Sequence, residues 1–202
     1  MKRILSLLAL LIVMHIPYAC MEDDCSDFTP LEARIKKVES SIGSLESDSF
    51  IDVQSTDFSV AAISLEITEM DFKEISEIRR VKYSSVFTSK AFACSPPLPE
   101  LAYEIIDITI SGTSSIFIND QEIQPNESLN SVFKVTNHNN IHFDEFVKTL
   151  NDNKWLFSFV GDQFTIALLQ QPDQPIDQAL TIKFEFSDNT SIEVLTDTFK
   201  VD

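Results

Sequence analysis

The sequence predicts a mainly β fold, an antiparallel β-sandwich of roughly seven to nine strands with one or two short helices. Three observations support this prediction. Runs rich in β-branched and aromatic residues recur along the chain, and Asn, Asp, Ser and Pro rather than Gly separate them. Within residues 103–112, three apolar residues alternate with polar ones, which is the period of a half-buried strand and predicts that Ile106, Ile108 and Ile110 share one face. Two short stretches have a clear helical spacing of apolar residues, against many strand-like runs.

The predicted strands begin at residue 33. Residues 33–42 fit a strand and a helix equally well, so this element is left open. The other strands are predicted at residues 58–68, 81–94, 103–112, 115–119, 164–172, 179–188 and 191–201. The sequence SDNT joins the last two and favours a hairpin turn, because Asp and Asn tolerate turn conformations. The proline-rich sequence SPPLPE ends the strand before it.

The two helical stretches cover residues 71–80 and 142–152. The first spaces its apolar residues three apart, from Phe72 to Ile78. The second places its apolar residues on one face, at the spacing i, i+3, i+4 and i+7: Phe143, Phe146, Val147 and Leu150. We expect both helices to pack on a sheet.

The composition limits the classes of function. The chain has 202 residues and a formal net charge of −17, a length that suits one domain with a sizeable core. A hydrophobic content of 44% is enough to build that core despite the charge. Phosphate backbones repel a protein this acidic, which argues against nucleic acid as a partner. Sixteen Phe against one Trp indicate that most aromatic side chains fill the core.

The first residues have the features of a secretory leader. Lys2 and Arg3 precede an apolar segment, residues 4–16, which is too short to span a bilayer. Ala19 then stands directly before Cys20. This arrangement resembles a bacterial lipoprotein signal, in which the cysteine receives a lipid and the peptidase cuts before it. The resemblance implies an acylated Cys20 that holds the chain at a membrane.

Two residues depart from that lipoprotein pattern. The family prefers Leu three residues before the cysteine and a small residue two before it, and this chain has Pro17 and Tyr18 there. Simple secretion, with cleavage after Ala19, is therefore the alternative to lipidation.

Residues 20–30 form an acidic tether. Its first acids resemble the export signal of Bacteroidetes-type lipoproteins, which directs them to the outer face of the outer membrane: Glu22, Asp23 and Asp24. Retention on the periplasmic face is the alternative. The predicted organisation is a signal peptide at residues 1–19, a lipidated acidic tether at 20–30 and a single β-sandwich domain at 31–202.

The chain has three cysteines. If Cys20 carries the lipid, Cys25 and Cys94 remain as a pair in an oxidising compartment, and a disulfide between them is a natural hypothesis. It would close a loop of about 70 residues and stabilise the fold by about 3–4 kcal/mol on the chain-entropy model. Two separate thiols are the alternative, because sequence does not give the distance between the two Cα atoms.

His138 and His142 are the candidate metal ligands. They stand four residues apart beside Asp144 and Glu145, so a helix that began early enough would place both imidazoles on one face. The two asparagines between them favour a turn or an N-cap instead, which would leave His138 outside the helix. The favoured interpretation is two exposed polar residues at a loop-to-helix junction, with no metal bound.

The sequence contains no motif for catalysis or for a cofactor. It lacks the G-x-S-x-G sequence of serine hydrolases, and its three Gly are too far apart to form a phosphate loop. Thirty-two acidic residues make any single pair of carboxylates uninformative. We therefore expect no cofactor and no enzymatic activity.

Several segments together resemble an uncharacterised family of Bacteroidetes lipoproteins. They are the Cys20 leader, residues 91–100, 103–111 and 128–133, and the closing hairpin. The resemblance implies a compact, mainly β domain and assigns no catalytic or binding residue. We expect a non-catalytic lipoprotein of the cell envelope that binds a protein or a small ligand, or has a structural role.

Two other functions stay open. The first is a metal-binding module or metal-dependent enzyme that uses His138 and His142, which requires both imidazoles to converge with a carboxylate. The second is a glycan-binding component of a surface uptake system, which requires Trp155 or Tyr103 to be exposed in a groove.

Overall fold

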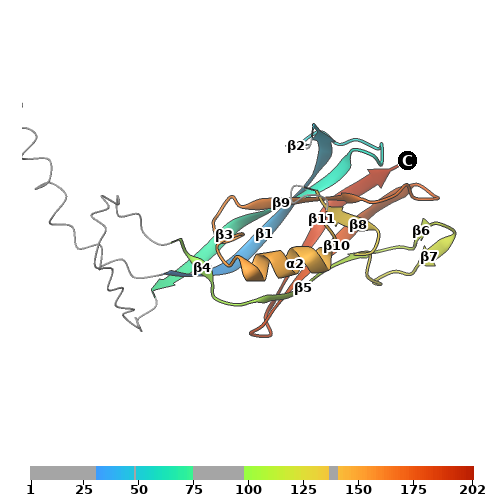
Figure 1. Cartoon of the computed structure of the whole chain (residues 1–202). Helices are drawn as coiled ribbons and strands as arrows, with labels where there is room; N and C mark the ends of the chain where they lie inside the picture. The colour runs from blue at the N-terminus through green and yellow to red at the C-terminus, as the bar shows by residue number, and fades with distance from the viewer. Residues whose placement is uncertain (1–30, 48, 75–97, 137–140) are drawn as a thin grey trace, which may run out of the picture. The chain divides into compact units, whose positions relative to one another are not determined.

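A computed structural model of the chain describes residues 31–47, 49–74, 98–136 and 141–202 (Figure 1). Several predictions lie outside these residues: the signal peptide, the tether with its lipid site, the three cysteines and their pairing, the strand at 81–94, and His138. The described residues contain eleven strands and one helix. This part of the chain contains no helix that is long and apolar enough to cross a bilayer.

The strands and the helix follow one another in this order: β1 (Leu31–Glu46), β2 (Ser49–Ile51), β3 (Ala61–Glu74), β4 (Glu100–Leu101), β5 (Ile105–Gly112), β6 (Ile116–Ile118), β7 (Gln121–Ile123), β8 (Phe133–Val135), α2 (Phe143–Asp152), β9 (Gln163–Leu168), β10 (Ile176–Phe186) and β11 (Ser191–Val201).

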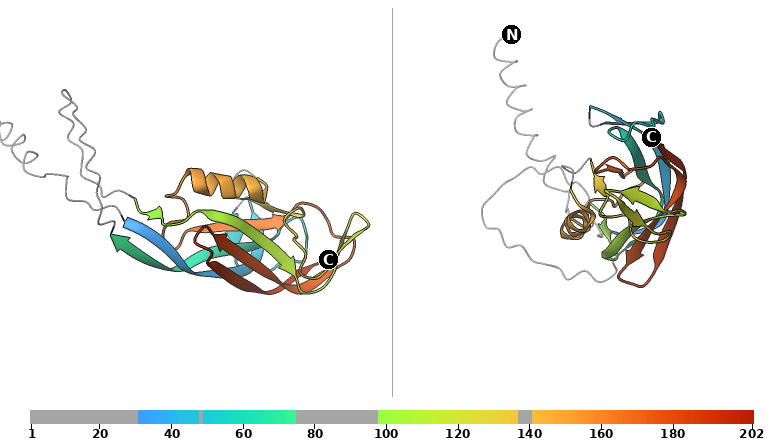
Figure 2. Two further views of the ribbon diagram at one scale, coloured as in Figure 1. Left: turned by 90° about the horizontal axis from the view of Figure 1, so that it is seen from below. Right: turned by 90° about the vertical axis from the view of Figure 1, so that its right-hand side faces the viewer.

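Two sheets and one hairpin make up the fold. The larger sheet has the strand order β2-β1-β3-β9-β8, and β4 pairs with β1 in the parallel direction. The smaller sheet has the order β11-β10-β5, and β6 and β7 form a separate hairpin. Figure 2 shows α2 along one side of the strands, with β10 and β11 on the opposite side. The fold is mainly β with antiparallel sheets, consistent with the predicted sandwich class.

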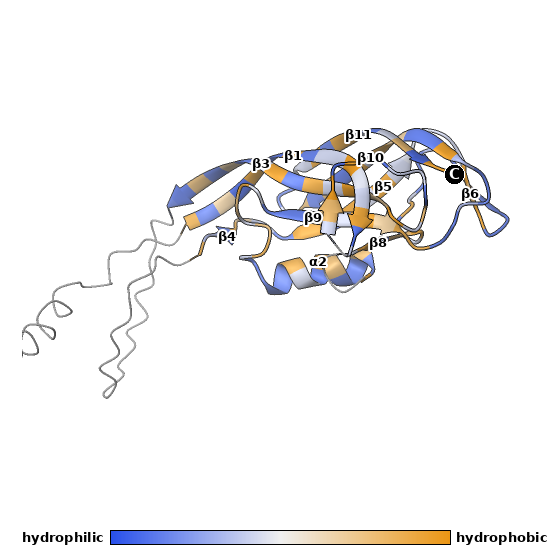
Figure 3. Ribbon diagram, turned by 90° about the horizontal axis from the view of Figure 1, so that it is seen from above, coloured by the Kyte–Doolittle hydropathy of each residue, from blue (hydrophilic) through white to orange (hydrophobic). Residues whose placement is uncertain are grey.

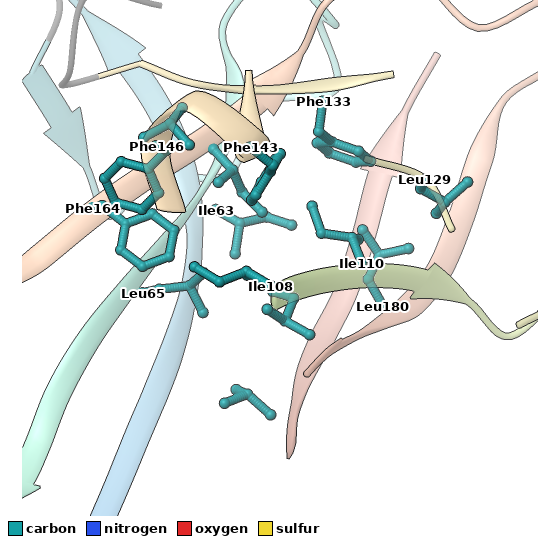
Figure 4. Packing of buried hydrophobic residues seen from close by; sticks show 14 of the residues in the cluster. Ile63, Leu65, Ile108, Ile110, Leu129, Phe133, Phe143, Phe146, Phe164 and Leu180 are labelled. Carbon is teal, nitrogen blue, oxygen red and sulfur yellow. The ribbon is translucent and has the colours of Figure 1, made fainter. Parts of the chain in front are cut away.

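One hydrophobic core joins both sheets and the helix. Figure 4 shows side chains from β3, β5, β8, β9, β10 and α2 that meet in one cluster. The Phe164 ring packs against three other aromatic rings of this cluster, with centroids 4.8 Å from Phe146, 5.3 Å from Phe157 and 6.2 Å from Phe184. The expectation that most Phe residues fill the core is confirmed for the described residues. Figure 3 shows that apolar and polar residues alternate along β1 and β3, as expected for strands with one face toward the core.

The long strands lie where the sequence predicts them. Residues 33–42, whose pattern is ambiguous between a strand and a helix, form part of β1. The prediction at 191–201 coincides with β11, and the SDNT sequence before it is a hairpin turn in which Asn189 has a φ of 65°. The strands predicted from residues 58, 103, 115, 164 and 179 correspond to β3, β5, β6, β9 and β10.

The number of strands is higher than predicted. Eleven strands form in the described residues, against a prediction of roughly seven to nine. The additional ones are the short strands β2, β4, β7 and β8, each of two or three residues. Such strands are too short to show a period in the sequence, and pairing with a neighbouring strand defines them.

The helix predicted at residues 71–80 is wrong over its first four residues. Residues 71–74 continue β3, and the rest of that prediction lies outside the described residues. An ion pair of 3.0 Å between Lys36 on β1 and Asp71 on β3 links the two strands here. Pairing with β1 therefore prevails over the helical spacing of the apolar residues, a case of tertiary context overriding a local pattern.

The inward face of β5 also differs from the predicted alternation. Ile105 pairs with Phe186 and Asp107 pairs with Glu185, so Ile106 has no partner and forms a β-bulge. The bulge turns Ile106 outward, where its side chain is 59% exposed, and buries Ile105 instead.

Candidate functional site

A surface hollow of about 410 Å³ lies at the start of α2. We call it the α2 hollow. Its lining is mainly polar: Ser128, Asn130, Ser131, His142, Phe143 and Asp144.

One wall of the α2 hollow is a loop fixed along the edge of β5. The Asn130 side chain accepts a hydrogen bond of 2.8 Å from the Ile110 N–H and donates one of 2.6 Å to the Ile108 carbonyl. Ser128 forms a β-bridge with Ser111 on the same strand. The amide of Asn130 is therefore occupied by the backbone of β5, and it positions Ser128 and Ser131 beside the hollow.

The other wall is the first turn of α2. His142 is the N-cap residue, in an extended conformation, and its side chain makes no capping hydrogen bond. Phe143 follows it and is buried, which fixes the helix against the core. Asp144 and Glu145 occupy the first turn, where a negative charge complements the positive end of the helix dipole. These two acids also make the hollow unfavourable for an anionic ligand.

The α2 hollow brings together residue types that also occur in hydrolases. Ser131 and His142 line it together with Asp144, although they come from two different segments of the chain. Within the described residues, however, no side-chain hydrogen bond joins His142 to either serine or to Asp144. Serine hydrolases depend on a hydrogen-bonded nucleophile and base, and the hollow presents its polar groups without that pair.

His142 stands at the start of α2, where the sequence predicts the helix to begin. It is exposed at a loop-to-helix junction, while His138 lies outside the described residues. Among the residues that the structure describes, no group of three or more His, Cys, Asp or Glu is arranged to hold a metal ion. The metal-site alternative, which requires His138 and His142 to converge, stays a hypothesis.

The two candidate aromatic residues for glycan binding have different environments. Trp155 is 49% exposed, which meets the first of that hypothesis's two requirements, exposure and a surrounding groove. Tyr103 is half-buried: its ring lies 6.1 Å from that of Phe186, and the Arg34 guanidinium lies 4.9 Å above it. Neither aromatic residue lines the α2 hollow.

A second hollow of about 170 Å³ lies between residues 114–117 and 174–178. The Gln178 side chain crosses it, accepting a hydrogen bond of 2.6 Å from the Ser114 N–H and donating one of 3.2 Å to the Ser114 carbonyl. Because Gln178 is buried and engaged in this way, we attribute to it the structural role of holding the loop after β5 against β10.

Clear pKa shifts among the described residues occur away from the α2 hollow. Contacts with Ser59 and Thr190 hold the pKa of Asp57 and Asp188, respectively, below the usual value for aspartate. Hydrogen bonds to carboxylates raise the pKa of three exposed lysines: Lys36, Lys37 and Lys183. These shifts follow from local turns and surface ion pairs, and they do not mark a cluster of catalytic groups.

The sequence predicts His142 as a candidate site residue but does not predict the serines beside it. Ser128 and Ser131 reach the hollow because their loop is held along β5 by the Asn130 amide, by the Leu129 N–H and by the Ser128–Ser111 bridge. The sequence has no local signal for those contacts, which depend on residues about 20 positions apart in the chain.

Comparison with protein-family models, with curated proteins and with solved structures finds no match to this chain.

Proposed function

We propose that this chain is a lipid-anchored, non-catalytic binding module of a bacterial cell envelope. The observation that carries the proposal is the order of its parts: an apolar leader, Cys20, acids, and then a β domain whose first strand starts at Leu31. The intervening residues 21–30 are polar and acidic, which suits a solvated tether between a lipid and a folded domain. The resemblance to Bacteroidetes-type lipoproteins supports the same assignment.

The α2 hollow supports a binding role. Its volume of about 410 Å³ falls within the range of small-molecule sites. Ser131 offers a hydroxyl group, His142 an imidazole and Asp144 a carboxylate, all beside the apolar edge of Phe143. Such a set favours a small neutral or cationic polar ligand, because the carboxylates at the start of α2 repel anions.

The anchor is tested by labelling cells with a fatty-acid precursor. We expect the wild-type protein and Cys25→Ala to incorporate the label, whereas Cys20→Ala does not. Cys25→Ala is the matched control, because it removes a thiol only five residues away and leaves the leader intact. An unlabelled wild-type protein would refute lipidation. Protease treatment of intact cells then distinguishes surface display from periplasmic retention, since only a surface tether is cut.

The hollow is tested by thermal-shift measurements with neutral monosaccharides, disaccharides, amino acids and polyamines. A compound that binds should raise the Tm of the wild-type protein, and Ser131→Ala and His142→Ala should each reduce that increase. Lys148→Ala, also on α2 but outside the hollow, should respond like the wild type. A compound whose effect survives both substitutions in the hollow binds elsewhere, and that outcome would contradict the assignment of this site.

A further inference from the structure

The loop between α2 and β9 has three exposed apolar residues at nearby positions in the sequence. Trp155 is 49% exposed, Phe159 36% and Val160 56%. Single exposed apolar residues are common on proteins, but three large ones within six positions of one loop are a candidate contact surface. We call these three residues the apolar loop patch.

The backbone of this loop is held in place. The Asp162 carboxylate accepts hydrogen bonds of 2.8 Å from the Ser158 N–H and 2.9 Å from the Phe159 N–H. Gly161 and Asp162 form a pair of backbone hydrogen bonds, of 2.8 and 2.9 Å, with Ile67 on β3. The exposure of the patch therefore belongs to a fixed conformation and does not result from a frayed segment.

Phe157 shows how the loop separates its apolar residues. Its φ of 58° lies in the left-handed region, which bulky residues rarely adopt. This conformation accompanies a buried Phe157 ring, at 5% exposure, that packs against Phe164 and Phe184. One aromatic side chain thus fixes the loop to the core while the apolar loop patch remains in solvent.

The patch lies near the point where the N-terminal tether meets the domain. The Lys154 carbonyl accepts a hydrogen bond of 3.0 Å from the Leu101 N–H, and Leu101 pairs with Ala33 near the start of β1. Two strand spacings, about 10 Å, therefore separate Lys154 from Ala33. Residues 21–30 can span at most about 36 Å when fully extended, so an anchored Cys20 keeps this end of the domain close to the membrane.

We propose that Trp155, Phe159 and Val160 insert into the lipid bilayer that holds the N-terminal anchor. The proposal rests on the function proposed above. Tryptophan prefers the membrane–water interface, and the tether makes the contact intramolecular, so that a small patch is sufficient. The net charge of −17 opposes anionic headgroups, and we therefore assign the contact to apolar insertion rather than to charge.

The test uses Trp155, which is the single tryptophan of the chain. The full-length protein is purified as the cell processes it and combined with phosphatidylcholine–phosphatidylethanolamine vesicles that contain brominated lipids. Bromine quenches tryptophan fluorescence only at short range, so quenching reports insertion of Trp155 directly. We expect clear quenching of the wild type and at least about twofold less in the double variant Phe159→Ser/Val160→Ser, which keeps Trp155.

Val53→Ser is the matched control. Val53 is 63% exposed, and its carbonyl binds the Ser44 hydroxyl at the far end of β1. Ser44 lies eleven positions after Ala33 on β1, which is about 35 Å along the strand. The quenching of Trp155 in the Val53→Ser variant should equal that in the wild type. Unfolding curves in urea establish that each variant is folded.

Mass spectrometry of Cys20 on the same sample separates the two proposals. An acylated protein with unquenched Trp155 leaves the anchor in place and overturns the bilayer contact. An unmodified Cys20 with quenched Trp155 supports the contact and refutes the anchor. Unquenched Trp155 together with self-association that Val160→Ser weakens would assign the apolar loop patch to a second copy of the chain and overturn the proposal.

Discussion

Asn151, near the end of α2, binds both backbone groups of Ile105 with its side-chain amide. The Ile105 N–H donates to Asn151 Oδ1 at 3.0 Å, and Asn151 Nδ2 donates to the Ile105 carbonyl at 2.8 Å. Asn130 binds Ile108 and Ile110 in a similar way further along β5. The two amides occupy backbone groups that a neighbouring strand would otherwise pair with, and so protect this sheet edge.

We predict that Asn151→Ala lowers the free energy of unfolding by about 1–3 kcal/mol. The substitution leaves the Ile105 N–H and carbonyl without partners at a position where the Ile105 side chain is fully buried. Urea denaturation measures the loss. Asp152→Ala, at the neighbouring exposed position, should change stability by no more than about 0.5 kcal/mol. Equal effects of the two substitutions would contradict a specific role for the amide.

The β-bulge in β5 gives a second prediction. Ile108→Ala should destabilise the protein by about 2–5 kcal/mol, because its side chain is fully buried in the core. Ile106→Ala should cost no more than about 0.5 kcal/mol, because its side chain is 59% exposed. The two substitutions are chemically identical, so chemical denaturation of both variants tests the register directly. A large loss of stability in the Ile106→Ala variant would contradict the β-bulge and support the simple alternation that the sequence suggests.

The sequence predicts the long elements because their signals are local. β10 and β11 are joined by a four-residue turn, so strand period and turn chemistry lie in one continuous segment. The outward rotation of Ile106 depends instead on the pairing of its neighbours Ile105 and Asp107 with Phe186 and Glu185, which are distant in the chain. Periodicity within one strand contains no information about that register.

The candidate sites show the same contrast between local sequence signals and contacts that distant residues make. His142 is predictable at the start of α2 because the apolar stripe of the helix begins at Phe143. The serines opposite it are placed by hydrogen bonds from Asn130 to β5, and no local pattern reveals such contacts. Trp155 is exposed, whereas Phe157, two residues later, is buried with a left-handed backbone conformation that the sequence does not signal. Composition alone assigns most aromatic residues to the core and therefore misses the apolar loop patch.

The turn between β6 and β7 gives a third prediction. Asn119 and Asp120 have φ values of 53° and 60°, the left-handed pair of a two-residue type I′ hairpin. We predict that Asp120→Gly stabilises the protein by about 0.5–1 kcal/mol, since glycine adopts this conformation without steric cost. The backbone N–H at this position keeps its bond to the Asp173 carboxylate in either variant.

Asp120→Ala is the matched comparison for that turn. Alanine lacks both the freedom of glycine and the tolerance of aspartate for a positive φ, so this variant should be less stable than the wild type. Thermal and urea unfolding of the three proteins give the order directly. An alanine variant as stable as the glycine variant would contradict the left-handed conformation.

Two aspartates at turns give a fourth prediction, on the pH dependence of stability. Ser59 donates to Asp57 Oδ1 through its N–H at 2.9 Å and its hydroxyl at 2.8 Å, which lowers the pKa of Asp57. Thr190 donates to Asp188 Oδ1 through its hydroxyl at 2.6 Å and its N–H at 3.1 Å, and lowers the pKa of Asp188.

The sign of this effect follows from proton binding. Because both pKa values are lower in the folded state, the unfolded chain binds protons first as the pH falls below about 4. The stabilisation is therefore complete above that pH and is lost on further acidification. Asp57→Asn/Asp188→Asn should flatten the curve of unfolding free energy against pH in the acidic range. Ser59→Ala/Thr190→Val, which keeps both carboxylates but removes the hydroxyl donors, should flatten the curve in the same direction. Urea unfolding at a series of pH values compares the three proteins, and parallel acidic slopes for all of them would show that neither turn contributes.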